Sequence, residues 1–204
     1  MSVNETHLNK FNCMKTKTLV LASFLLAMMI FVAGCKKDED PEPQKNIARL
    51  GAQSNTTVGG FLSVSAKKVY TMSEAFQQQD KIDILCFYEE ASGNNIALAA
   101  PGTGIDGIFT GDNAPDNWTT TNQTYFTDPA TEITTVQFDQ LTDGDAVIQG
   151  YYDETVTSGN RKKKDMKVND MYAFKTAAGT FGVLKVTAVE QGASGYVEFE
   201  YKVK

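Results

Sequence analysis

The alternation of apolar and polar residues near the C-terminus most constrains the fold of this chain. Residues 170–176, 181–190 and 196–202 have the composition of strands, and turn-rich segments at 177–180 and 191–195 separate them. Every second residue of the last segment is apolar, and the residues between are charged or tyrosine. A period of two is typical of an antiparallel strand with one buried face. The chain is therefore expected to end in a three-stranded antiparallel meander.

The apolar run 82–88 predicts a central strand. Asp83 is its one charged residue, and a strand that is apolar at almost every position is covered on both faces of its sheet. A turn-rich sequence follows the run, and 96–100 can return as its hairpin partner. Shorter strands are expected at 61–65 and 69–71.

Two helices are expected between these strands. The sequence at 71–74 has the form of a capping box, in which a threonine and a glutamate satisfy free backbone N–H groups, and it predicts a short helix at 75–79. A second cap signal at 142–145 precedes apolar residues at helical spacing and predicts a helix at 143–154. The fold class is therefore α+β, mainly antiparallel β-sheet with two short helices.

Residues 15–35 have the features of a secretory signal. Two lysines precede the uncharged, mainly apolar stretch 19–33, and two small residues end the segment immediately before Cys35. This stretch is shorter than the ~20 residues that a permanent membrane helix needs. A retained membrane helix is therefore the weaker interpretation.

The signal divides the chain into three parts. Residues 1–34 are expected to be removed, and 1–13 could be a mis-assigned start because Met14 is followed by lysine and makes a more typical beginning. Residues 35–46 contain two prolines and a run of charges, which predict an extended tether. Residues 47–204 have the length of one globular α+β domain.

The signal ends in Val32-Ala33-Gly34-Cys35, which resembles the lipobox of bacterial lipoproteins. The resemblance implies that Cys35 is acylated and held in a membrane by its acyl chains. The next five residues look like the export signal of Bacteroidota lipoproteins on the outer face of the outer membrane: Lys36, Lys37, Asp38, Glu39 and Asp40. The alternative is a solvated acidic spacer. The tail from 170 to 186 resembles the end of small uncharacterised lipoproteins of that phylum, and this resemblance implies no activity.

Histidine and cysteine usage excludes several chemistries. The single histidine, His7, lies in the part that is expected to be lost. The mature protein then has no imidazole for a zinc site, a haem ligand or a catalytic triad, so no cofactor is expected. Cys86 is the one cysteine of the domain, and its apolar surroundings predict a buried, unreactive thiol.

Periodicity disappears between residues 101 and 129, where Gly, Asp, Asn, Thr and Pro dominate. A loop of this length in a compact domain is either functional or poorly ordered. Exposed aromatic rings with polar neighbours could stack on a sugar. The candidate ligand-binding residues are Trp118, Tyr125, Phe126, Asp112 and Asp116. The alternative, which we favour, is that the rings fix the loop to the core.

Carboxylates are the remaining groups that could carry chemistry. Asp106, Asp112 and Asp116 provide the oxygen ligands that Ca²⁺ prefers, but their spacing is not that of an EF-hand loop, and solvated turn residues are the favoured interpretation. A pair of carboxylates could also hydrolyse a glycan, although sequence spacing does not place two of them face to face.

Charge and anchoring together favour a binding role. The formal net charge of −6 becomes −8 once residues 1–34, with three lysines and one glutamate, are removed, and so acidic a protein repels nucleic acid. The basic run 161–164 is expected to be a solvated turn or a contact with lipid phosphates. We expect a non-enzymatic, surface-exposed protein that binds a glycan or a protein. The alternatives are a carboxylate-based glycan hydrolase and a structural subunit of an envelope complex.

Overall fold

The computed structural model describes residues 44–204, apart from 91–92, 94, 103 and 157–158. The lipidation residue Cys35 and the expected export signal at 36–40 lie outside the described residues. Within the described part of the chain, no helix is long and apolar enough to cross a membrane.

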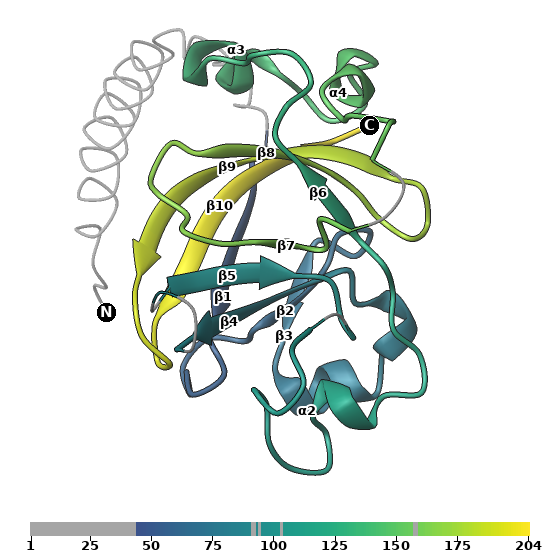
Figure 1. Cartoon of the computed structure of the whole chain (residues 1–204). Coiled ribbons are helices and arrows are strands. Elements are labelled where there is room, and N and C mark those ends of the chain that lie inside the picture. Colours follow the sequence, from purple (N-terminus) through teal and green to yellow (C-terminus); the bar gives the residue numbers. More distant parts are fainter. Residues whose placement is uncertain (1–43, 91–92, 94, 103, 157–158) are drawn as a thin grey trace, which may run out of the picture. The chain divides into compact units, whose positions relative to one another are not determined.

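One five-stranded antiparallel sheet contains the C-terminal meander (Figure 1). Its strand order is β1-β10-β9-β8-β6. In that order the strands are Asn46–Gly51, Tyr196–Val203, Phe181–Glu190, Met171–Lys175 and Tyr125–Thr127. The three meander strands lie where the alternating pattern predicted them. The strand β1 was not predicted, and it begins at Asn46, where the tether was expected to end.

The second five-stranded antiparallel sheet contains the predicted central strand. Its order is β3-β2-β4-β5-β7. In that order the strands are Lys68–Tyr70, Phe61–Ser63, Ile84–Glu89, Asn95–Ala99 and Lys162–Lys163. β4 pairs with β2 on one side and with β5 on the other, which confirms its central position.

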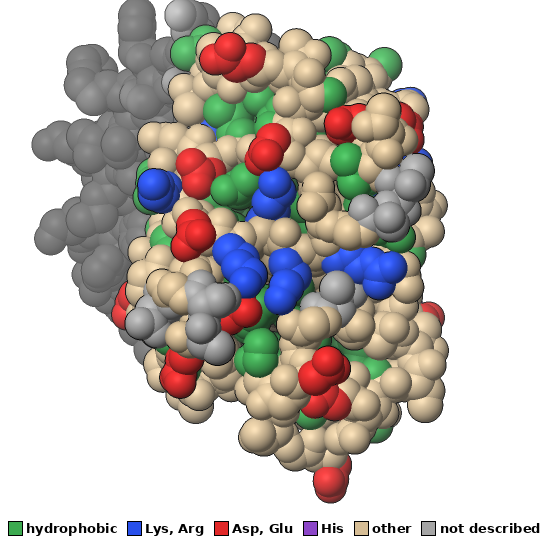
Figure 2. All heavy atoms as spheres, in the orientation of Figure 1, with side chains coloured by type: hydrophobic (Ala, Val, Ile, Leu, Met, Phe, Trp, Pro, Cys, Tyr) green, Lys and Arg blue, Asp and Glu red, His purple; other side chains and the backbone are tan. Residues whose placement is uncertain are grey.

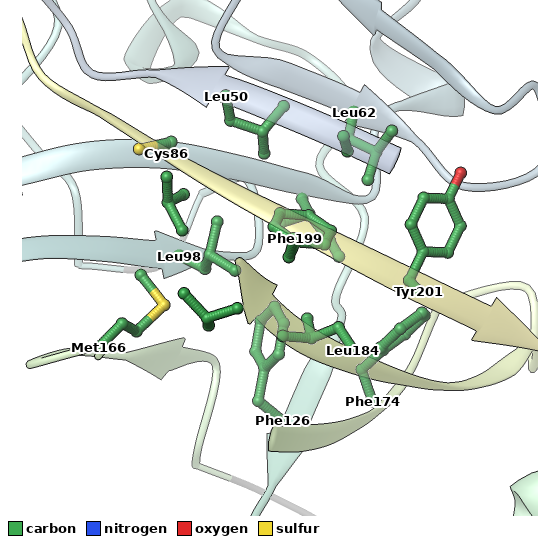
Figure 3. Close-up of a cluster of buried hydrophobic side chains, with 14 of the residues drawn as sticks. Leu50, Leu62, Cys86, Leu98, Phe126, Met166, Phe174, Leu184, Phe199 and Tyr201 are labelled. Atoms are coloured by element: carbon green, nitrogen blue, oxygen red, sulfur yellow. The ribbon is translucent and has the colours of Figure 1, made fainter. Parts of the chain in front are cut away.

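The main core lies between the two sheets (Figure 3). Leu62 and Leu98 of one sheet point toward Phe174 and Phe199 of the other, and such interdigitating inner faces hold stacked sheets together. Cys86 belongs to this core and is fully buried, as predicted. Burial raises the pKa of its thiol well above the usual range, so the thiol stays protonated and unreactive.

Two smaller clusters cover the outer faces of the sheets. Leu85 and Phe87 of β4 point away from the main core and pack with Ile105, Phe109 and Trp118 of the long loop. On the outer face of the other sheet, Val183 of β9 packs with residues that follow β6, namely Ile133, Phe138, Leu141 and Ile148. Both faces of β4 are therefore covered, as its continuous apolar run predicted.

Three short α-helices are present in the described residues, where two were expected. α2 (Met72–Phe76) has the predicted capping box between Thr71 and Glu74, although it starts three residues earlier than expected. α3 (Thr135–Gln140) was missed, and it starts with a second capping box between Thr134 and Gln137. The mainly antiparallel sheets with few short helices confirm the α+β class.

The predicted helix at 143–154 is wrong in extent, because only Val147–Gly150 is helical (α4). Asp143, which was expected in the first turn of this helix, instead accepts hydrogen bonds from the side chain of Asn46, the ammonium of Lys67 and the backbone N–H of Val203. The cap position is Ala146, which has no side-chain acceptor. The local cap signal is partly formed, because Asp145 accepts the backbone N–H of Thr142 at 2.8 Å, but Gly144 has a left-handed φ of 89° and is therefore not helical.

The outer face of β10 corrects a second expectation, that the charged residues of this strand face solvent. Glu200 is 5% exposed and Lys202 is 6% exposed. The ammonium of Lys202 lies 2.9 Å from the carboxylate of Glu200 and 6.0 Å from the ring centroid of Phe138 in α3. Both charges are buried as a pair, which is the usual condition for burying ions.

Candidate functional site

Two of the three candidate aromatic residues belong to the core. Trp118 is 8% exposed; its ring lies 5.6 Å from that of Phe61, and its indole N–H donates to the carbonyl of Asn113 at 3.0 Å. Phe126 is fully buried between the two sheets (Figure 3). The loop at 101–129 is thus pinned to the domain by its apolar side chains, and its last part forms β6. Neither ring is available to a ligand.

Tyr125, the third aromatic candidate, is half-buried at the edge strand β6 and lines a cleft of about 660 Å³. Ligand sites in proteins are typically of ~300–1,000 Å³. The cleft is formed by the end of the long loop, the segment after α4 and the turn between β8 and β9. Its lining residues are Thr121, Asn122, Gln123, Tyr125, Tyr152, Glu154, Val156, Lys175, Thr176, Ala177 and Gly179. Sequence reasoning missed most of them, because they come from three distant segments.

The side chains of this Tyr125 cleft are mainly neutral hydrogen-bonding groups. The hydroxyl of Tyr125 donates to the amide oxygen of Gln123 at 3.2 Å, and the one charged pair, Lys175 and Glu154, is joined at 3.1 Å. Burial, and then the nearby Glu154 carboxylate, raise the pKa of Tyr152, so its hydroxyl remains a neutral donor. The Tyr125 cleft therefore suits an uncharged ligand with many hydroxyl groups.

A small pocket of about 120 Å³ adjoins the Tyr125 cleft and contains Asp83. Asn122 and Thr176 line both spaces. The amide N–H group of Asn122 donates to the backbone oxygens of Asp80 and Ile82, which ties the wall of the cleft to the segment that carries Asp83. The remaining lining residues of the Asp83 pocket are Val64, Ser65, Asp80, Lys81, Ala178 and Thr180.

Asp83 is the buried carboxyl of this region. It is 6% exposed and accepts one hydrogen bond, from the backbone N–H of Val64 at 2.8 Å. Burial raises its pKa to about 6, and the Val64 hydrogen bond offsets only part of that effect. Among the described residues, no lysine or arginine forms an ion pair with it. The sequence did contain a signal for this group, as the one charge in an apolar run.

The candidate calcium residues do not come together as a metal site. Asp106, Asp112 and Asp116 are exposed, and a carboxylate oxygen of Asp116 accepts the backbone N–H of Gly107 at 2.8 Å. In residues 44–204, leaving aside the undescribed gaps, no three His, Cys, Asp or Glu side chains are placed to hold a metal ion. Asp112 and Asp116 also lie outside the lining of the Tyr125 cleft.

A second cleft, of about 650 Å³, is lined by the earlier part of the long loop, including Asp106 and Phe109. Glu89 on its wall lies within 4.0 Å of Lys162 and also pairs with Lys164. Three of its lining residues, Glu89, Glu90 and Asp106, are acidic. The Tyr125 cleft, with a half-buried ring among neutral groups, is the better candidate for an uncharged ligand.

The basic run 161–164 is not a solvated turn, which corrects that expectation. Lys162 and Lys163 form β7 and pair with Leu98 and Ala99 of β5. Figure 2 shows Lys and Arg side chains gathered on the face where β7 lies in Figure 1. Lys163 is 2.9 Å from the carboxylate of Asp128. Acidic partners therefore neutralise much of the run.

Neither a family model nor a curated protein matches the chain. Among solved structures, it is similar to a DUF4466 family protein from Parabacteroides merdae, with 16% sequence identity and a TM-score of 0.44. The match covers 79% of this chain and 55% of the neighbour, so the chain spans about half of the neighbour's length. The neighbour comes from the Bacteroidota, but a likeness of this size carries no inference about fold or function.

Proposed function

We propose that this chain is a lipid-anchored protein on the outer face of the outer membrane that binds a neutral glycan and does not act on it chemically. The observation that carries the binding role is the Tyr125 cleft, in which a half-buried aromatic ring lies among uncharged hydrogen-bonding side chains. The anchoring part of the proposal rests on the signal segment and on Cys35.

A sugar ring has an apolar face and a rim of hydroxyl groups, and the Tyr125 cleft offers a partner for each. Tyr125 provides an aromatic surface for the apolar face, next to the Arg161 guanidinium, which lies 5.6 Å from the centroid of its ring. Gln123 and Thr121 are exposed beside it and provide donors and acceptors. The Lys175–Glu154 pair leaves the lining without net charge, which disfavours charged ligands relative to neutral ones.

Calorimetric titration of the detergent-solubilised full chain tests the binding role. The probes are tetrasaccharides of β-1,4-linked glucose, mannose and xylose and of α-1,4-linked glucose. Tyr125→Ala should weaken the binding of any that bind by about tenfold or more, because it removes the stacking surface. Tyr88→Ala is the matched control, since Tyr88 is a half-buried tyrosine of the second cleft. If Tyr88→Ala weakens glycan binding and Tyr125→Ala does not, the binding site lies in the second cleft.

Protease treatment of intact cells tests the surface location. We expect the protein to be cut without any opening of the outer membrane. Cleavage that requires an opened outer membrane would contradict surface exposure. The same outcome would leave the binding role of the cleft unaffected, because the titration is done on purified protein.

A glycan hydrolase is the second candidate, and the pKa of Asp83, raised to about 6, favours it because a general acid needs such a value. Asp80 lines the same pocket and would be the second carboxyl. The pocket volume of about 120 Å³ argues against it, because a scissile bond needs room for a sugar on each side. New reducing ends that appear with the wild type but not with Asp83→Asn would establish hydrolysis instead of binding.

A further inference from the structure

We propose that the Asp83 pocket is a specificity subsite of the Tyr125 cleft, which takes the exocyclic hydroxymethyl arm of a bound hexose with the Asp83 carboxyl as hydrogen-bond acceptor. The inference rests on the proposed glycan binding and adds the class of sugar. It would make this protein selective for hexose chains over pentose chains, which lack that arm.

The turn between β8 and β9 separates the pocket from the cleft. Ala177 and Gly179 line the cleft, whereas Ala178 and Thr180 line the pocket. Thr176, at the start of the turn, lines both spaces, and so does Asn122 on the facing segment. The two spaces therefore share a wall, and a group that projects from a ligand in the cleft past this wall would reach the pocket.

The size of the pocket selects the group that enters. A volume of about 120 Å³ equals roughly four water molecules at ~30 Å³ each. That is enough for a carbon with its hydroxyl group and a remaining water, but it is below the ~300 Å³ at which ligand sites begin. The sugar ring therefore stays in the larger cleft, and an arm that projects from the ring fits the pocket.

Asp83 has acceptor capacity that the protein leaves unused. Oδ2 accepts the Val64 N–H, and no other hydrogen bond to the carboxyl is formed by the described residues. Lys81 lines the same pocket, yet its ammonium donates to the side-chain oxygen of Gln78 at 2.5 Å. Asp83 lines the pocket, so its carboxyl can accept a further hydrogen bond from a donor that enters this space.

The carboxyl is also held in place. The backbone N–H of Asp83 donates to the carbonyl of Leu62, and its side chain is bound to Val64, so both ends are fixed to β2 and the residue that follows it. A buried carboxyl that is fixed and lacks a charged partner is unfavourable for folding alone. Such groups gather at functional sites, where a ligand completes their hydrogen bonds.

The test compares cellotetraose with xylotetraose, which share the β-1,4 linkage and differ by the hydroxymethyl arm. The detergent-solubilised full chain should bind the hexose tetramer at least about tenfold more tightly, because the pentose leaves the Asp83 oxygen without a donor. Asp83→Asn should reduce this preference and leave xylotetraose affinity unchanged. Its amide oxygen would stay on the Val64 N–H, so its NH₂ group would face the pocket. That group cannot accept the hydroxyl proton, and the uncharged bond that it could donate to the hydroxyl oxygen is weaker than a bond to a carboxylate.

Asp80→Asn is the matched control, because Asp80 is an exposed carboxyl of the same pocket and should not alter the preference. Some hexose tetrasaccharides, α-linked or β-linked, could bind wild type and Asp83→Asn with the same affinity. That result would overturn the subsite and leave the proposed glycan binding intact. Equal loss of hexose and pentose affinity would also overturn the subsite. Absence of binding by every tetramer would overturn the proposed function and the subsite together.

Discussion

The surroundings of Asp143 and Asp83 show that hydrogen-bond partners, more than burial, determine whether a carboxylate stabilises the fold. Partial burial alone would raise the pKa of Asp143. Its carboxylate accepts hydrogen bonds from Asn46, Lys67 and the Val203 N–H, and together these outweigh the burial and lower the pKa. Asp83 is buried, accepts one hydrogen bond, and has a raised pKa.

The two carboxylates therefore affect stability in opposite directions. Asp143 joins the start of β1, the loop after β2 and the end of β10, and ionisation strengthens those contacts. Ionised Asp83 weakens the fold and lines a pocket instead. Both lie near the buried Tyr201, whose pKa is raised to about 12 by burial and then by the charges of Asp143 and Asp83. If the proposed binding role holds, neighbouring sites in one domain serve folding and binding separately.

Replacing Asp143 should have the largest effect on stability. Asp143→Ala removes the acceptor of three donors, one of them on the buried Asn46, and should lower the free energy of unfolding by about 2–3 kcal/mol. Urea denaturation should show a lower midpoint at an unchanged slope. Asp139→Ala is the control, because its ion pair with Lys185 is exposed on the Asp139 side and is worth at most ~1 kcal/mol. Equal effects of the two variants would contradict the role of Asp143.

The pH dependence of Asp143 has a definite sign. Because its folded pKa is lowered, its contribution is present above its ordinary pKa of 3.8 and is lost as the pH falls through the lower folded value. Wild type should therefore lose stability below pH 4 more steeply than Asp143→Ala does. Parallel acid unfolding curves of the two proteins would count against this assignment.

Replacing Asp83 should change the free energy of unfolding in the opposite direction to replacing Asp143. Its folded pKa is about 6 against an ordinary value of 3.8, so wild-type stability falls as the pH rises from about 4 to above 6. Asp83→Asn keeps the Val64 hydrogen bond and removes the charge, and it should raise the free energy of unfolding by about 1–3 kcal/mol at pH 8 and by little at pH 4. Denaturation at the two pH values provides the measurement. Destabilisation at pH 8 would make Asp83 a structural residue like Asp143.

The helix cap at Thr134 provides a reference substitution that involves no ionisable group. The hydroxyl of Thr134 accepts the backbone N–H of Gln137 at 3.2 Å at the start of α3. Thr134→Ala should cost about 1 kcal/mol, and equally at pH 4 and pH 8, because no ionisable group is involved. A pH-dependent loss would show that the proton-linked effects of Asp83 and Asp143 are not specific to them.

Removing the lipid anchor should leave the stability of the globular domain unchanged. Cys35→Ser eliminates the sulfur that acylation needs, so the protein should become soluble or stay unprocessed while its urea midpoint is kept. Labelling with a palmitate analogue measures acylation directly. Label that persists in the variant would end the lipoprotein interpretation.

Local patterns predicted the regular part of the fold well. The covered strand β4 and the meander β8–β10 follow from side-chain periodicity, which is a property of each segment alone. The helix at 143–154 failed at its start because Gly144 has a left-handed φ of 89° and its backbone N–H donates to the carbonyl of the distant Val203. The burial of Glu200 likewise depends on Lys202 and on what covers the sheet.

The candidate site was less predictable for the same reason. Tyr125 could be named from its neighbours, whereas Tyr152 and Lys175 reach the cleft only because β6 pairs with β8 and the segment after α4 returns beside them. Asp83 stood out in the sequence as a charge in an apolar run. Its pocket forms only when the end of β2 and the β8–β9 turn are brought together, which no local pattern encodes.

We propose that Asp83 serves binding at the expense of the fold, and stability and affinity measured on one preparation of Asp83→Asn test this proposal. At pH 8 the variant should unfold at a higher urea concentration than wild type and bind hexose tetrasaccharides at least about tenfold more weakly. A variant that unfolds more easily and binds hexose tetrasaccharides as tightly as wild type would show that Asp83 serves the fold and not a ligand.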